Sequence, residues 1–222
     1  MRRVRTAVLV SGNGSNLQAL LDTAKANDYP AEICLVISNI EGAYALTRAE
    51  NAGVPTVIIP HQNFPDRESF DRMLDASLKT HQIELICLAG FMRILSAWFV
   101  EEWHGRLLNI HPSLLPKYKG LNTHARVIEA GEKEHGATVH WVTQELDSGE
   151  IILQESLPVM PDDTPESLQQ RLHVLEHQLY PEALRIAAAG LRHNIPRFEA
   201  GTRARLGKWP YRFIRWIERY LP

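Results

Sequence analysis

The sequence predicts a single α/β domain built on a twisted, mostly parallel sheet with helices on both faces. Three observations indicate this class. Short apolar runs alternate with amphipathic segments through the first 90 residues, which is the pattern of strands joined by helical crossovers. A glycine-rich turn follows the first apolar run directly. Farther along, two more apolar runs flank a polar turn, and they predict an antiparallel strand pair in the C-terminal part.

The first half of the chain supplies most of the parallel sheet. Leu17, Leu20 and Leu21 fall on one face of a helix that follows the glycine-rich turn, as an amphipathic segment requires. Gly53 is a favourable end for the next helix. This half is therefore Rossmann-like. Strands are predicted at residues 4–10, 32–38, 54–59 and 83–88, and helices after residue 15, at 42–52 and at 67–80.

The second half changes its pattern after Gly90. Pro181 lies inside the last helical segment, where it would remove a backbone hydrogen bond, so we expect an interruption there. The chain has no internal repeat and no low-complexity linker, which favours one continuous sheet. Helices are predicted at residues 95–103, 124–130 and 164–189, and strands at 107–111, 137–142 and 151–159.

We therefore expect one domain over residues 1–200, in two halves at 1–100 and 101–200. Residues 201–222 form an amphipathic tail rich in aromatic and basic side chains. Such a segment can lie on a membrane, but packing against its own domain is the simpler expectation.

Composition excludes several classes of protein. The 222 residues are 45% hydrophobic and 23% charged, with a formal net charge of -2, and a general nucleic-acid binder would carry a basic excess. No run approaches the roughly 20 apolar residues that cross a bilayer. Cys34 and Cys87 both lie in apolar runs, so buried reduced thiols are expected. A cytoplasmic protein without nucleic-acid or membrane partners follows from these features.

The glycine-rich turn at residues 11–16 predicts an anion site. Glycines let backbone N–H groups approach a phosphate, and the helix N-terminus adds partial positive charge. A dinucleotide fingerprint would need a third glycine where Leu17 stands and an acid where the second strand ends at Asn39. Both are missing, as is the lysine of a P-loop. The phosphate of a mononucleotide-like ligand is the favoured interpretation, and a plain strand-to-helix turn is the alternative.

Asn109 and His111 stand at the end of a predicted strand. Side chains alternate along a strand, so these two point to the same side, and Pro112 keeps the chain extended before it. Ligands of open α/β sheets bind beyond the carboxyl ends of strands. An amide and an imidazolium converging there would suit a reaction that builds negative charge on a carbonyl oxygen. The alternative is a structural pair joined by hydrogen bonds.

An imidazole needs a neighbouring carboxylate to remain charged at neutral pH. Asp147, in the turn between the last two predicted strands, is the candidate. An aspartate before Ser-Gly is also ordinary turn chemistry, and sequence spacing alone does not bring residues 111 and 147 together.

A competing motif lies in the last helix. His173, Glu176 and His177 match H-x-x-E-H, a metallopeptidase pattern. Patterns this short occur by chance, and ten histidines raise the odds. Helix histidines without a bound metal are the expected interpretation.

Four stretches together resemble one family. They are SGNGSNLQA at residues 11–19, LAGFMRILS at 88–96, GRLLNIHPSLLPKYKG at 105–120 and EHGATVHWVTQELDSGEIILQ at 134–154. They are similar to the phosphoribosylglycinamide formyltransferases, which are folate-dependent enzymes of purine synthesis, and the similarity extends over about residues 4–190. The resemblance implies transfer of the formyl group of 10-formyltetrahydrofolate to the glycinamide amine. It also implies a nucleotide-binding first half, a catalytic and folate-binding second half, and no metal.

Matching residue by residue, the resemblance assigns three groups. The catalytic residues would be Asn109, His111 and Asp147. The ribonucleotide would contact Gly14, Ser15, Asn16 and Glu176. The folate would contact Arg67, Met92, Arg93, Ile94, Leu95, Asn109, Thr143, Gln144, Glu145, Leu146 and Asp147.

Two positions depart from the family pattern near the site. Lys119 stands where proline is expected, and Asn122 stands where histidine is frequent, so the rigidity of the loop near Gly120 is in question. The partners implied are small-molecule substrates only, and the chain would be a monomer or a homodimer.

Two other functions remain open. A formyltetrahydrofolate hydrolase shares the chemistry, but it usually carries an N-terminal regulatory domain, and an enzyme acting on aminoacyl-tRNA would need an added basic domain. Neither domain is expected in this sequence. A non-catalytic nucleotide-binding module is the remaining alternative, and it would bind the ribonucleotide without any dependence on folate.

Overall fold

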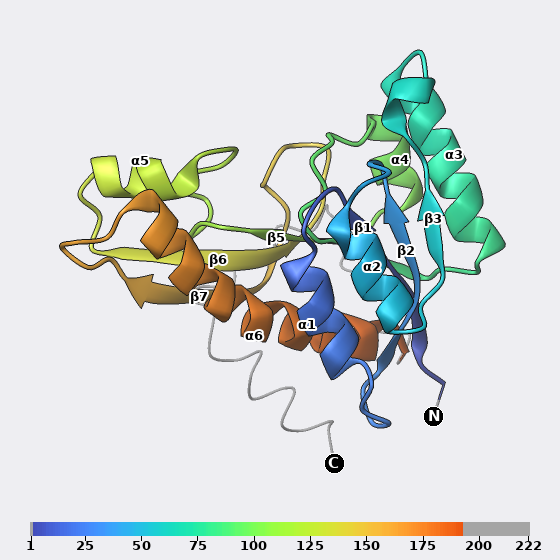
Figure 1. Ribbon diagram of the computed structural model, residues 1–222, viewed down its shortest axis with the longest axis horizontal. Helices are drawn as coiled ribbons and strands as arrows, with labels where there is room; N and C mark the ends of the chain where they lie inside the picture. The colour runs from blue at the N-terminus through green and yellow to red at the C-terminus, as the bar shows by residue number, and fades with distance from the viewer. Residues whose placement is uncertain (1, 193–222) are drawn as a thin grey trace, which may run out of the picture.

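The computed structural model describes residues 2–192 and contains one seven-stranded sheet in the order β3-β2-β1-β4-β5-β6-β7 (Figure 1). Strands β1 to β5 run parallel, and β6 and β7 are antiparallel to their neighbours. The predicted single α/β domain is confirmed. The strands are β1 Val4–Val10, β2 Ala31–Ser38, β3 Thr56–Ile58, β4 Leu85–Leu88, β5 Leu107–His111, β6 Glu134–Trp141 and β7 Ile151–Pro158.

The helices also follow the predicted order. They are α1 Ser15–Thr23, α2 Tyr44–Asn51, α3 Arg67–Thr80, α4 Ala97–Glu102, α5 Thr123–Glu129 and α6 Pro165–Arg192. A short 3-10 turn at His61–Asn63 was not predicted. Strand β3 is shorter than the predicted 54–59. The expected tail at 201–222 and the domain boundary at residue 200 lie outside the described residues.

The expected interruption near Pro181 is wrong, because α6 continues through it. Pro181 is buried, as are Tyr180 and Leu184 beside it. The hydroxyl of Tyr29 donates to the Pro181 carbonyl at 2.6 Å, which ties the helix to the core at this point. Packing of a long apolar face therefore outweighs the lost backbone hydrogen bond.

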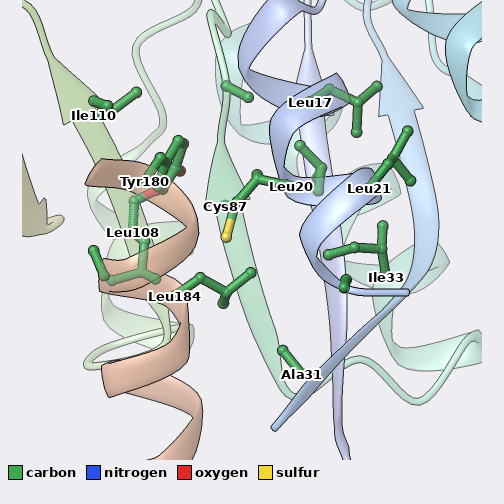
Figure 2. Packing of buried hydrophobic residues seen from close by; sticks show 14 of the residues in the cluster. Leu17, Leu20, Leu21, Ala31, Ile33, Cys87, Leu108, Ile110, Tyr180 and Leu184 are labelled. Carbon is green, nitrogen blue, oxygen red and sulfur yellow. The ribbon is translucent and has the colours of Figure 1, made fainter. Parts of the chain in front are cut away.

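The two faces of the sheet bury separate cores. Helices α1, α2 and α6 cover one face, and α3 and α4 cover the other. Figure 2 shows Leu20 of α1 on one side of Cys87 of β4 and Tyr180 of α6 on the other. Cys87 is buried as predicted, whereas Cys34 is only half-buried. Burying a leucine contributes roughly 1.5–3 kcal/mol, so these two layers fix the frame of the sheet.

Strand β5 alternates as predicted. Leu108 and Ile110 point into the α1/α6 core, and Leu107 points into the α3/α4 core. Asn109 and His111 therefore lie on the side of the sheet that Leu107 occupies. Their position follows from the same apolar pattern that builds the core.

A switch point separates β1 from β4, because the chain leaves β1 toward β2 and returns to β4 on the other side. Ligands of doubly wound sheets bind at such a point. Here the Ser11 hydroxyl accepts a hydrogen bond of 2.8 Å from the Met92 backbone N–H. The Tyr180 hydroxyl donates to the carbonyls of Leu88 and Leu108, at 3.0 and 3.3 Å. These bonds join the loops after β1 and β4 and hold α6 to β4 and β5.

Within residues 2–192, no helix combines the length and the apolar character needed to cross a bilayer.

Candidate active site

The structure brings the predicted catalytic trio, Asn109, His111 and Asp147, together near the end of β5. His111 Nδ1 lies 3.4 Å from Asp147 Oδ2, and both side chains are 7% exposed. Asn109 stands two residues before His111 on the same face of the strand, as the alternation predicted. His111 Nε2 lies 2.9 Å from the Tyr118 carbonyl. Both ring nitrogens therefore face oxygen atoms that only accept hydrogen bonds.

His140 completes this group, and the sequence analysis missed it. It lies opposite Asn109 in the β5–β6 ladder. Its Nδ1 is 2.9 Å from the Trp141 carbonyl and therefore carries the hydrogen. Its Nε2 is then free to accept from the Asn109 amide, at 3.3 Å. Burial lowers the pKa of His140, which keeps the ring neutral.

His140 Nε2 also lies 3.8 Å from Asp147 Oδ1. A neutral ring makes no ion pair, so this contact adds packing rather than charge. The strand register that places His140 beside Asn109 was not available from the sequence, although a histidine in the predicted strand 137–142 was a visible signal.

Asp147 reaches the site because its turn folds back over the sheet. The residue has a positive φ of 48°, a conformation that aspartate and asparagine tolerate better than most residues. Its Oδ2 accepts the Gly120 backbone N–H at 2.9 Å. A pocket of about 320 Å³ opens beside it, lined by Leu115, Pro116, Lys119, Glu145, Asp147, Ser148, Gly149 and Ile151.

The predicted ribonucleotide residues form a second group at the N-terminus of α1. Asn16 Nδ2 donates to Glu176 Oε2 at 2.9 Å, which joins two residues 160 positions apart. Glu176 is buried, and its burial raises the pKa of the carboxyl group. The Asn16 Oδ1 atom is buried without a hydrogen-bond partner. Gly14, just before the helix, has a left-handed φ of 75°.

Replacing Gly14 by alanine should destabilise the fold. An added Cβ would lie 2.6 Å from Ala45 Cβ and would adopt a left-handed backbone. Strain and overpacking together should cost roughly 2–4 kcal/mol in the free energy of unfolding. Gly12→Ala is the matched control, because nothing lies within 4 Å of its added Cβ. Urea denaturation of both variants measures the difference, and equal midpoints would contradict the predicted clash.

The predicted folate residues lie on three segments. Arg67 begins α3. Arg93 packs over the Phe70 ring at 5.0 Å, and its Nε is buried without a partner. Large apolar side chains that are exposed on these segments are Met92 at 70%, Ile94 at 62% and Leu146 at 55%. Exposed apolar groups of this size are typical of a binding surface.

The remaining predicted folate residues differ in exposure. Leu95 is buried, so it supports the loop rather than contacting solvent. In the turn of Asp147, the Thr143 hydroxyl donates to the Glu145 carbonyl at 3.1 Å. Gln144 lies between them, exposed in the same turn.

A pair of histidines joins α5 to β6. His124 Nδ1 is 3.0 Å from His135 Nε2, and their rings meet edge to face. Burial lowers the pKa of both residues, that of His135 to about 4. Electrostatic interactions with His173 of α6 and with His111 lower the pKa of His124 further.

This pair should make stability depend on pH. An unfolded histidine titrates near 6.5, so the unfolded state binds more protons between about pH 6.5 and 4. The stabilisation from neutral His135 is therefore complete above 6.5 and is lost as the pH falls toward 4. His135→Gln should reduce the loss between pH 7 and pH 4 by roughly 2–4 kcal/mol. Urea unfolding at both pH values tests this, and an unchanged pH dependence would contradict it.

The metallopeptidase pattern does not form a metal cluster in the described part of the chain. The His173 and His177 rings stack at 6.2 Å between centroids, and Glu176 is bonded to Asn16. Among residues 2–192, no group of three or more His, Cys, Asp or Glu side chains is arranged to hold a metal ion.

Comparison with known proteins decides the family. The family model described as formyl transferase matches residues 4–184. The chain belongs to the formyl transferase family. The matched range includes Asn109, His111 and Asp147.

Two characterised relatives of similar length carry one name. Phosphoribosylglycinamide formyltransferase of Haemophilus influenzae is 46% identical over 80% of this chain and 84% of its own length. The Escherichia coli protein of the same name is 48% identical over 78% of this chain and 82% of its own length. A solved structure of phosphoribosylglycinamide formyltransferase from Coxiella burnetii has a TM-score of 0.81 and 51% identity, covering 85% of this chain and 89% of that chain.

A longer relative also matches. The trifunctional purine biosynthetic protein adenosine-3 of Drosophila melanogaster is 53% identical over 85% of this chain. This chain spans only 14% of the length of that relative.

Proposed function

We propose that this chain transfers the formyl group of 10-formyltetrahydrofolate to the amine of 5-phosphoribosylglycinamide. The products would be formylglycinamide ribonucleotide and tetrahydrofolate, as in de novo purine synthesis. The observation that carries the proposal is the convergence of Asn109, His111 and Asp147, with a 3.4 Å contact between imidazole and carboxylate. The bacterial relatives of similar length support the choice of acceptor.

Asn109 is the oxyanion donor in this proposal. The amine attacks the formyl carbon, and the carbonyl oxygen becomes an oxyanion. One hydrogen of the Asn109 amide is used by His140, and the second is free to donate to that oxygen. The strand and His140 already orient the Asn109 amide. It therefore needs little reorganisation during the reaction, which is the basis of oxyanion stabilisation.

His111 supplies positive charge beside the same oxygen. Its Nε2 donates to Tyr118 in the structure and would exchange that carbonyl for the oxyanion. Asp147 lies 3.4 Å from the other ring nitrogen and would orient the ring. The new bond joins the amine nitrogen to the formyl carbon. As the bond to folate N10 breaks, the proton lost by the amine passes by way of Asp147 and water, and N10 is protonated.

The α1 N-terminus would hold the ribonucleotide phosphate. Backbone N–H groups of Gly14, Ser15 and Asn16 open the helix, where an anion is stabilised. Glu176 is fixed by Asn16 and would contact the ribonucleotide.

The folate would bind along the apolar side chains exposed after β4 and in the Asp147 turn. Met92, Ile94 and Leu146 provide apolar surface. Arg67 and Arg93 are cations that suit carboxylates, because a guanidinium donates in a fixed fork. The proposed reaction needs no metal, because charge on the oxyanion is balanced by His111 and the Asn109 amide.

An absorbance assay of folate turnover tests the proposal. Donor consumption that depends on glycinamide ribonucleotide is the expected result. Donor consumption without the ribonucleotide would indicate a hydrolase. Ribonucleotide binding with no donor consumption would indicate a non-catalytic module.

A further inference from the structure

We propose that Lys119 is a positioning residue that ties the Asp147 turn to the loop after β5 and thereby sets the affinity for the folate donor. The inference rests on the proposed function for its kinetic readout. It concerns a position where this chain departs from the pattern of its family, since proline was expected there.

The side chain of Lys119 contacts the turn at two residues, one before and one after Asp147. Its Nζ lies 3.2 Å from Glu145 Oε1 and donates to the Ser148 hydroxyl. The same residue lines the pocket of about 320 Å³ beside Asp147. One ammonium group therefore connects its own loop to residues 26 and 29 positions farther along the chain.

The backbone on either side of Lys119 contacts the proposed catalytic pair directly. The Tyr118 carbonyl accepts from His111 Nε2 at 2.9 Å. The Gly120 N–H donates to Asp147 Oδ2 at 2.9 Å. A shift of this tripeptide relative to the turn would thus move His111 and Asp147 apart.

Other parts of the loop are anchored elsewhere. Near its start, the Thr138 hydroxyl donates to the Ser113 carbonyl at 2.6 Å, and Gln154 Nε2 donates to the Leu115 carbonyl at 2.9 Å. Near its end, Arg126 Nη1 donates to the Lys119 carbonyl at 2.7 Å. These bonds hold the loop to β6, β7 and α5. The Lys119 side chain adds a second connection to the Asp147 turn, beside the hydrogen bond from the Gly120 N–H.

The strength of this tether should depend on salt. The side chains of Lys119 and Glu145 are 35% and 77% exposed, so ions screen their attraction. Glu145 belongs to the predicted folate-binding segment. Residues that bind a ligand must be held near their bound geometry by their surroundings. A salt-sensitive tether on this turn should change donor binding more than ribonucleotide binding.

Lys119→Met, Lys119→Arg and Lys117→Met test the proposal. Lys117 is the matched control, because it belongs to the same loop but pairs with Glu132 at 2.9 Å, away from Asp147. At low salt, Lys119→Met should raise the KM for 10-formyltetrahydrofolate roughly 3- to 10-fold and leave the KM for glycinamide ribonucleotide within twofold. Lys119→Arg should restore most of the loss, and Lys117→Met should match wild type.

Raising the salt concentration should bring wild type toward Lys119→Met, because salt screens the Lys119–Glu145 attraction that the variant lacks. Equal changes in both KM values, or an unchanged donor KM, would overturn the proposal. So would a difference between wild type and variant that is as large at high salt as at low salt.

Amide hydrogen exchange of the free protein separates this inference from the proposed function. Lys119→Met should speed exchange in residues 143–149 and 118–122, and Lys117→Met should not. If wild type shows no ribonucleotide-dependent transfer, the proposed function fails while the exchange result still decides the tether. Unchanged exchange in Lys119→Met would refute the tether whatever the activity.

Discussion

His111→Ala should lower formyl transfer by a factor on the order of 10²–10³, which is the cost of removing one donor to an oxyanion. The imidazolium is the only member of the trio that would bring positive charge to the developing oxyanion. The side chain is buried at the end of β5, where Nε2 is hydrogen-bonded to the Tyr118 carbonyl and Nδ1 lies 3.4 Å from Asp147 Oδ2. Alanine leaves Asp147 without the cation that faces it. Asn109→Ala should produce a loss of similar size for the same reason.

The matched control is His104→Ala, because His104 is an exposed histidine before the start of β5, at the opposite end of that strand from His111. Transfer is measured by the absorbance assay, and ribonucleotide binding by calorimetry. Binding of the ribonucleotide should stay close to wild type in His111→Ala, since its phosphate is expected at the α1 N-terminus. Near-normal turnover in His111→Ala would show that the trio is assigned wrongly.

Asp147→Asn should lower transfer by a factor on the order of 10²–10⁴, as loss of the charged partner does in other imidazole–carboxylate pairs. Asparagine is the informative substitution. It tolerates the positive φ of 48° at this position, and its amide oxygen can still accept the Gly120 N–H. The change therefore removes charge and keeps the turn.

Thermal unfolding and the absorbance assay are both needed for this variant. Asp162→Asn, at an exposed aspartate outside the site, controls for loss of a carboxylate. A melting temperature close to wild type together with a large loss of transfer is expected. If Asp147→Asn retained turnover within threefold of wild type, the carboxylate would not be what holds His111 charged.

Apolar periodicity was enough to predict the frame of this protein. The strands at residues 4–10 and 107–111 and the helix at 67–80 have the predicted bounds, because each buries one regular face. The same alternation put Asn109 and His111 on one side of β5. Four sequence motifs between residues 11 and 154 were enough to suggest the family, and the formyl transferase match covers residues 4–184.

Predictions that depended on local rules alone were less reliable. Pro181 was expected to interrupt α6, and it does not. The proline disfavours helix locally, but Tyr180, Leu184 and their neighbours bury a continuous face against the sheet. Cys34 is only half-buried although it lies in an apolar run. In both cases the packing around the residue decided the outcome.

Sequence by itself determined the order of strands and helices and the presence of an amide and an imidazole at a strand end. Only the tertiary structure decided what meets them. His140 reaches Asn109 through the antiparallel register of β6, Asp147 reaches His111 because its turn folds back, and Lys119 spans two loops. Periodicity is a property of neighbouring residues along the chain. These contacts join residues 26 to 36 positions apart, and their geometry depends on the twist of the whole sheet and on the path of its loops.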